Sequence, residues 1–209
     1  MNIKTLPQNG LRGPAEHSVR DQILLAADRH FSHFGYGKTT VSDLAKAIGF
    51  SKAYIYKFFP SKQAIGEAIC HQCLETVINK VQEALREEEP AARQLRVLYN
   101  TIAAASSELF FSERRLYDIV IYSTGEAWPS SRAYEAQVRE LLKNILQRGR
   151  DSGEFERETS LDEQCRAIFL VMESFVNPLL LQYKLEGMTE AIEDLVRLVV
   201  RSLTARSDH

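Results

Sequence analysis

The sequence predicts an all-α protein of about nine helices, with an N-terminal three-helix domain followed by a larger helical domain. Apolar residues recur at helical spacing along most of the chain, and the alternation of an amphipathic strand is not found. Only 10 Gly and 6 Pro occur in 209 residues, so long helices are permitted. The charge is divided, because residues 1–62 hold nine Lys or Arg against four Asp or Glu, whereas residues 63–209 hold seventeen against twenty-four. A basic head joined to an acidic body is typical of a DNA-binding domain fused to another domain.

The first segments are expected to be a flexible tail at residues 1–17 and a helix at residues 18–34. The tail is rich in Pro and Gly and lacks an apolar period. Lys4 and Arg12 could let it act as a minor-groove arm, although such a segment is more often a tail without a binding role. The helix has an apolar stripe formed by Ile23, Leu24, Ala27, Phe31 and Phe34.

Residues 39–62 predict two short helices joined by a tight turn. Thr40 opens a T-x-x-D capping box for the first helix. Gly49 follows the apolar face of that helix, where a left-handed residue commonly ends a helix. Ser51 is a suitable N-cap for the second helix, which is expected to cover residues 52–59. Two short helices about a Gly-containing turn are typical of the helix-turn-helix, whose second helix can lie in the major groove of DNA.

The solvent face of this second helix carries two cations, two phenols and no acid, which favours contact with DNA. The side chains expected to meet base edges lie near its start, with one from the first helix: Lys52, Ala53, Tyr54 and Ser42. Those expected to meet phosphates flank this face with hydrogen-bond donors: Thr40, Tyr56, Lys57 and Lys62. The alternative is that an aromatic-rich short helix only fills the core, although four aromatic residues in six cannot all face inward.

The stretch from residue 35 to residue 62 reads G-x-x-x-T-T-V-S-D-L-A-K-A-I-G-F-S-K-A-Y-I-Y-K-F-F-P-S-K. It resembles the DNA-binding domain of the TetR (tetracycline-repressor) family of bacterial regulators. The similarity covers about residues 19–69, and its most telling part is the closing Y-x-x-F-x-x-K, formed by Tyr56, Phe59 and Lys62. Two positions depart from the family pattern. Ala53 stands where Gly is frequent, and Phe58 stands where a residue that could contact the DNA backbone is common.

The resemblance implies a cytoplasmic homodimer that binds a near-palindromic operator as a sequence-specific transcriptional regulator. It further implies a repressor that leaves the DNA when a small-molecule effector enters the helical body. Two other interpretations stay open. The chain could be an architectural or interaction protein that binds DNA without an effector, or a thiol redox-responsive protein.

Residues 63–209 are expected to form the effector-binding and dimerisation domain. Its helices are expected at residues 61–88, 91–111, 113–124, 131–152, 161–184 and 189–205, with a kink at Pro178. The helix at 161–184 is apolar nearly all round, so it must be buried on more than one side. We expect it to pair with the last helix and their copies about a two-fold axis. One large monomeric core is the alternative.

An effector pocket is expected where aromatic residues gather between residues 91 and 184. Small-molecule pockets are mostly apolar and aromatic with a few polar groups. The candidate lining consists of Tyr99, Tyr117, Tyr122, Trp128, Phe169 and Glu173. The alternative is that these residues belong to the core, because aromatic side chains at helical spacing are more often packed in a core than lining a pocket.

The sequence offers little catalytic chemistry, and no enzyme activity, cofactor or metal is expected. It has no Walker loop, H-E-x-x-H, G-x-S-x-G or Gly-rich dinucleotide turn. Three cysteines give no disulfide framework, which fits a reducing cytoplasm. Cys70 and Cys73 form a C-x-x-C inside a helix, where inert cysteines are the simpler interpretation. No run of 18 apolar residues exists, so no membrane span is expected.

Overall fold

The computed structural model describes residues 16–85 and 90–204, and it confirms the all-α prediction, because these ranges contain no strand. Residues 1–15 of the expected tail, and the expected helix ends at residues 88 and 205, lie outside the described residues. The helices are α1 Glu16–Phe34, α2 Val41–Ile48, α3 Lys52–Ile55, α4 Lys62–Ala84, α5 Ala91–Ser112, α6 Arg114–Gly125, α7 Pro129–Ser152, α8 Leu161–Val176, α9 Pro178–Leu181 and α10 Met188–Leu203. None of them combines the length and apolarity needed to cross a bilayer.

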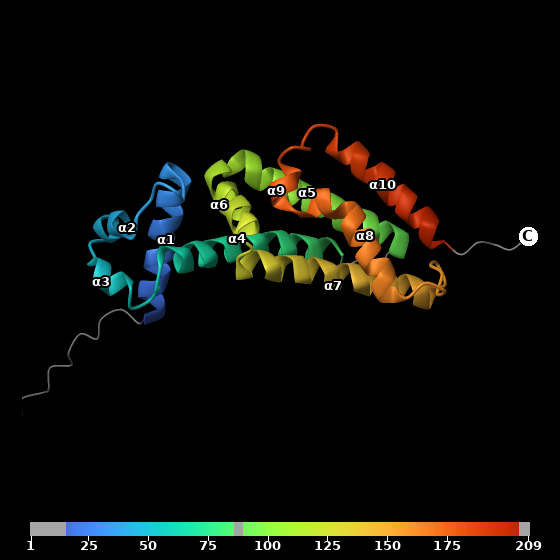
Figure 1. Ribbon diagram of the computed structural model, residues 1–209, viewed down its shortest axis with the longest axis horizontal. Helices are drawn as coiled ribbons and strands as arrows, with labels where there is room; N and C mark the ends of the chain where they lie inside the picture. The colour runs from blue at the N-terminus through green and yellow to red at the C-terminus, as the bar shows by residue number, and fades with distance from the viewer. Residues whose placement is uncertain (1–15, 86–89, 205–209) are drawn as a thin grey trace, which may run out of the picture.

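Helices α1–α3 form a small head at one end of the molecule, and α4 runs from this head into the body (Figure 1). The centre of the head is made of fully buried apolar side chains, including Phe31, Leu44 and Ile55. Helix α4 packs against α1 on the head side and against α5, α6 and α7 in the body. It therefore contributes buried side chains to both parts.

The helix expected at residues 161–184 is broken at Pro178, which is why ten helices are found within the described ranges where about nine were expected. Helix α8 ends at Val176, and Asn177 adopts an extended conformation with φ −79° and ψ 115°. The Asn177 side chain then accepts a hydrogen bond from the N–H of Leu179 at 2.9 Å and caps α9. A proline disfavours the helical conformation in the residue before it, so the chain restarts a helix here instead of bending one.

Two buried phenols satisfy the backbone carbonyls at this break. The hydroxyl of Tyr117, on α6, donates to the carbonyl of Pro178 at 2.8 Å. The hydroxyl of Tyr134, on α7, donates to the carbonyl of Val176 at 3.2 Å. A buried carbonyl without a partner would cost about 1–3 kcal/mol. The two tyrosines therefore allow the break to lie inside the body.

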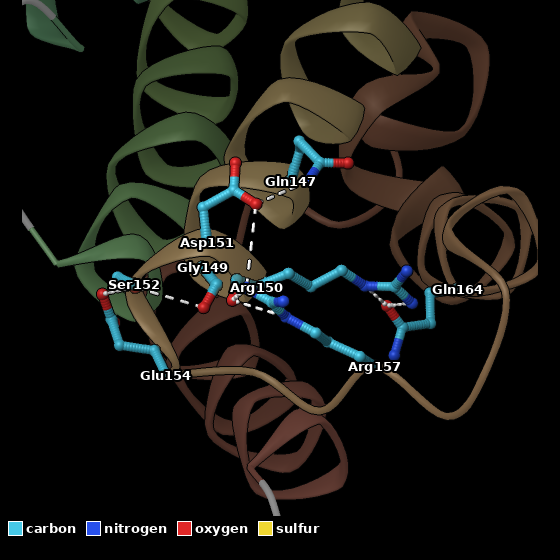
Figure 2. Close-up of polar contacts among 8 residues, drawn as sticks. All are labelled: Gln147, Gly149, Arg150, Asp151, Ser152, Glu154, Arg157 and Gln164. Atoms are coloured by element: carbon cyan, nitrogen blue, oxygen red, sulfur yellow. Dashed lines mark hydrogen bonds and ion pairs between the residues drawn. The ribbon is translucent and has the colours of Figure 1, made fainter.

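A polar cluster at the end of α7 connects this helix to the following loop and to α8 (Figure 2), and further bonds from the loop reach α5 and α10. The guanidinium of Arg150 is buried and donates to Gln164 Oε1 on α8, at 3.1 Å from Nε, and to the carbonyl of Thr159. Arg157 in turn donates to the carbonyl of Arg150 at 3.0 Å. The N–H of Glu156 donates to the carbonyl of Leu203 at 2.8 Å, which holds the end of α10 against the same loop.

Glu154 in this cluster supplies the cap that α5 lacks locally. The residue before α5 is Pro90, which makes no side-chain cap. The carboxylate of Glu154 instead accepts from the N–H groups of Ala91 and Ala92 at 3.0 and 3.3 Å. A negative charge at the N-terminus of a helix also interacts favourably with the helix dipole.

We expect Glu154→Ala to lower the free energy of unfolding by about 1–2 kcal/mol, because the first N–H groups of α5 lose their acceptor. Glu154→Gln keeps one acceptor oxygen and should lose less. Glu158→Ala, an exposed change in the same loop, is the matched control. Denaturant unfolding followed by circular dichroism measures all three variants, and equal stability of Glu154→Ala and Glu158→Ala would contradict the cap.

Candidate nucleic-acid interface and effector site

Local capping fixes the two short helices of the head as the sequence predicts. Thr40 and Asp43 form the reciprocal capping box, with Thr40 N–H to Asp43 Oδ2 at 2.9 Å and Asp43 N–H to Thr40 Oγ1 at 3.2 Å. These bonds to Thr40 hold the pKa of Asp43 below its usual value. Gly49 closes α2 with φ 71°, a left-handed conformation that suits a residue without Cβ. Ser51 Oγ accepts from the N–H of Tyr54 at 3.1 Å and starts α3.

The second helix is shorter than the expected range of residues 52–59. Helix α3 covers Lys52–Ile55, and the following residues continue as tight turns. The N–H of Lys57 bonds to the carbonyl of Tyr54, and that of Phe58 bonds to the carbonyl of Ile55, both three residues back. This tighter winding keeps Ile55 and Phe59 buried while leaving Tyr56 and Lys57 exposed.

The exposed side of α3 forms a cationic and aromatic surface without an acid. Lys52, Ala53, Tyr56 and Lys57 are exposed, and Tyr54 is half-buried. The rings of Phe50, Tyr54 and Phe58 form an edge-to-face series, with neighbouring centroids 5.1 and 5.4 Å apart. The ammonium of Lys52 lies 5.7 Å from the Tyr56 ring centroid, and that of Lys57 lies 5.6 Å from the Tyr54 centroid. The surface can thus offer positive charge and hydroxyl donors together, as a phosphate backbone requires.

Of the three remaining residues predicted to contact DNA, two are accessible and the third is hydrogen-bonded within the head. Thr40 is exposed as the N-cap of α2, and Ser42 is half-buried in the first turn of that helix. Lys62 instead points back into the head. Its ammonium donates to the carbonyls of Tyr36 and Gly37 at 2.8 and 3.4 Å and lies 4.3 Å from the Tyr36 ring centroid. Burial lowers the pKa of Lys62. Because its ammonium is bound to two carbonyls of the head, we expect Lys62 to position the head as well as to attract phosphate.

An aromatic cluster connects the head to the body next to Lys62. Tyr36, in the turn after α1, packs its ring against Tyr122 and Trp128 with centroids 5.3 and 5.6 Å away. Gly66 of α4 lies directly beneath these rings. A Cβ at Gly66 would approach Tyr36 Cε2 to 2.7 Å and Trp128 Cη2 to 3.0 Å. The cluster closes against α4 only because position 66 has no side chain.

The side chains expected to line an effector pocket are mostly packed in the core. Tyr99, Tyr117, Trp128 and Phe169 are each at most 4% exposed. Tyr117 is bound to the α8–α9 break, Trp128 and the half-exposed Tyr122 belong to the head–body cluster, and Arg139 covers the Phe169 ring. Glu173 is half-buried on α8. Tyr99 remains a candidate ligand contact, because its buried hydroxyl has no hydrogen-bond partner among the described atoms.

A cavity of about 320 Å³ lies elsewhere, between α1, α4 and α5. None of the six expected lining residues contributes to it. Its apolar wall includes Ile69, Val77 and Leu109, and its polar groups come from Asp28 on α1, Glu108 on α5 and Glu113 at the start of α6. The sequence pattern missed this cavity because its acids occupy helix positions that look like ordinary solvent-exposed ones.

The cysteines of the C-x-x-C lie on α4 and are free. The thiol of Cys70 is buried and donates to Ser123 Oγ at 3.0 Å. Cys73 lines the cavity, and burial raises its pKa to about 12, with smaller contributions from Cys70, Asp28 and Glu113. Burial also raises the pKa of Cys70. Because the thiolate is the reactive form, these environments favour inert thiols.

The head has two capped helices with a basic exposed face, and one long helix joins it to an all-helical body. This arrangement is that of a DNA-binding transcription regulator. The family comparisons agree. Residues 23–69 match the model of the bacterial regulatory proteins of the tetR family, and residues 91–197 match that of the tetracyclin repressor-like C-terminal domain. The chain belongs to the TetR family of bacterial transcription regulators.

Individual relatives are more distant. The nucleoid occlusion factor SlmA of Aliivibrio fischeri strain MJ11 is 30% identical over 92 residues, which is 44% of this chain and 47% of that protein. The chain therefore spans about half the length of the curated relatives it matches. A TetR family regulator, PfmR of Thermus thermophilus, superimposes with a TM-score of 0.55 at 26% identity over 86% of this chain and 97% of PfmR. FadR of Bacillus subtilis, in complex with stearoyl-CoA, gives 0.64 at 19% identity over 88% and 98%.

We expect Gly66→Ala to destabilise the junction of head and body. The added methyl group must displace Tyr36 or Trp128, and overpacking of this kind costs about 1–3 kcal/mol, of which the better helix propensity of Ala offsets up to about 1 kcal/mol. Gly125→Ala is the control, because a Cβ at this α6 position meets nothing within 4 Å. Thermal unfolding compares the two, and a Gly66→Ala protein at least as stable as Gly125→Ala would show that the cluster yields without cost.

Proposed function

We propose that the chain is a cytoplasmic, sequence-specific repressor that binds a near-palindromic operator as a homodimer and leaves it when a small-molecule effector binds. The observation that carries this proposal is the exposed face of α3, which presents two lysines and two phenols, without an acid, on a capped helix-turn-helix. Family membership supports it, since the matched family consists of bacterial regulatory proteins.

The DNA contacts follow from what each side chain exposes. We assign base-edge contacts to Lys52, Ala53 and Tyr54, because they occupy the first turn of α3, and we add Ser42 from the first turn of α2. Thr40, Tyr56 and Lys57 flank them with exposed donors and are assigned to phosphates. Lys62 is assigned a double role, because two of its three ammonium protons are used within the head and the third is left for a phosphate.

The dimer is supported by exposed apolar side chains on the helices expected to pair. Leu170 on α8 and Leu198 on α10 are 67% and 63% exposed, and Val171 is 48% exposed. Exposed apolar surface on adjacent elements marks interaction sites, and α8 and α10 pack against each other. An isologous interface of these helices would hold two heads at a fixed separation, with half-sites about one helical turn or a little more apart.

The response to an effector is supported by the architecture of the body. FadR of Bacillus subtilis, which shares this fold, was crystallised with stearoyl-CoA, and we take from it only that such a body can admit a small molecule. The effector need not resemble that one. Its action requires higher affinity for one arrangement of the two heads than for the other.

The alternative proposal is an architectural DNA-binding protein without an effector, and it rests on the likeness to the nucleoid occlusion factor SlmA. The two proposals differ in how DNA sites are distributed. Genome-wide occupancy confined to a few promoters favours the repressor, whereas many dispersed sites favour the architectural protein.

We expect Lys57→Ala and Lys52→Ala to weaken DNA binding in different ways. Lys57→Ala should lower affinity equally for selected and random duplexes and reduce the slope of log K against log salt by about one unit, because it removes a phosphate contact. Lys52→Ala should cost about 1–3 kcal/mol mainly on the selected sequence. Fluorescence anisotropy at several salt concentrations measures both, with Lys184→Ala in the body as control. Equal losses on both duplexes for both variants would refute the assigned roles.

We expect Leu198→Glu to give monomers that bind operator DNA weakly, because a charge would be buried where two copies of α10 meet. Phe111→Glu is the control, since Phe111 is a 73% exposed aromatic residue on α5, a helix that is not expected to form the interface. Sedimentation velocity reports the assembly state. An unchanged dimer in Leu198→Glu would place the interface elsewhere.

A further inference from the structure

The cavity between α1, α4 and α5 lies at the junction of head and body. Asp28 belongs to the head, Ile69 and Val77 belong to the shared helix α4, and Leu109 and Glu113 belong to the body. Its volume of about 320 Å³ falls at the lower end of the range of small-molecule sites, which occur preferentially between domains. A molecule held here would contact both parts of the protein at once.

The charges around the cavity are unbalanced. Three carboxylates line it, and the one cation among its described lining residues, Lys80, is already paired with Glu108. Asp28, which is half-buried, and Glu113, which is exposed, make no side-chain hydrogen bond or ion pair within the described residues. Burial raises the pKa of Asp28 and the nearby Glu113 raises it further, whereas the smaller effect of Arg29 lowers it. Among the described residues, Arg29 acts on Asp28 without forming an ion pair, so this side of the cavity keeps two carboxylates that are not bound to a cation.

We propose that this cavity is the effector site and that it takes an organic cation with an apolar body. The ammonium group lies between Asp28 and Glu113, and the apolar part packs against Ile69, Val77 and Leu109. This inference rests on the proposed function, which it deepens by naming the class of effector. An anion would meet two unpaired carboxylates, and a neutral molecule would leave their repulsion in place.

Such a ligand has a direct route to the DNA-binding surface. The repulsion between Asp28 and Glu113 opposes the approach of α1 to the start of α6, two helices that pack against each other. A cation between the carboxylates replaces that repulsion with attraction and sets the position of the head on the body. If this position differs from the DNA-bound one, operator DNA must weaken cation binding by the same factor that the cation weakens DNA binding.

The site is tested with benzyltrimethylammonium, a permanent cation, against neopentylbenzene, a neutral molecule of the same shape. Isothermal titration on the full chain without DNA measures binding to the unmodified protein, Asp28→Asn, Glu113→Gln and the control Glu186→Gln, which is exposed and away from the cavity. We expect the cation to bind at least about tenfold more tightly than the neutral molecule, and Asp28→Asn and Glu113→Gln each to lose about fivefold, on the scale of one partly solvated ion pair. Glu186→Gln should bind as the unmodified protein does.

A second variant covers the possibility that the carboxylate changes disturb the fold. Ala105→Leu fills the cavity from α5 without altering charge, and it should abolish cation binding while circular dichroism stays unchanged. Equal affinity for the cation and the neutral molecule, or full cation affinity in Asp28→Asn and Glu113→Gln, would overturn the inference. These titrations contain no DNA, so their failure leaves the proposed repressor standing, whereas a protein that binds cations but selects no operator sequence would refute the repressor alone.

Discussion

The structure depends on one constraint, which is that a single helix belongs to two cores. Helix α4 has 23 residues and therefore extends over about 34 Å at 1.5 Å per residue. Ile65 and Ile69 are buried at its head end, and Val77 and Val81 are buried in the body. Because packed interiors resist deformation, α4 cannot rotate or slide in the body without carrying the head. Gly66 strengthens this coupling, because the absence of a side chain lets the aromatic rings of the junction pack directly against the helix backbone.

The head could be predicted closely because its signals are local. The capping box at Thr40, the left-handed Gly49 and the cap at Ser51 each involve residues a few positions apart, so the sequence states them directly. The length of α3 was overestimated, because the tight turns after Ile55 keep the same side chains buried as a continued helix would. The inward bonds of Lys62 depend on carbonyls 25 and 26 residues away, and no local pattern indicates them.

The body was predicted as helices but not as a site, for a related reason. Periodicity identifies buried aromatic residues, yet it does not say whether a buried phenol faces a ligand or a carbonyl. Tyr117 is held by a carbonyl that exists only because the chain breaks at Pro178. The cavity, in turn, is marked by Asp28 and Glu113, 85 positions apart, whose unpaired charges become notable only when α1 lies beside α6.

The distant cap on α5 has a consequence for how the chain folds during synthesis. The acceptor of the first N–H groups of α5 lies 63 residues further along, at Glu154. The amino end of α5 therefore stays uncapped until α7 and the loop after it have left the ribosome. The head relies on contacts of short sequence separation, and such contacts form fast, whereas long-range closure is slow. The DNA-binding end is thus ready early, and the body that controls it becomes complete only with its last helices.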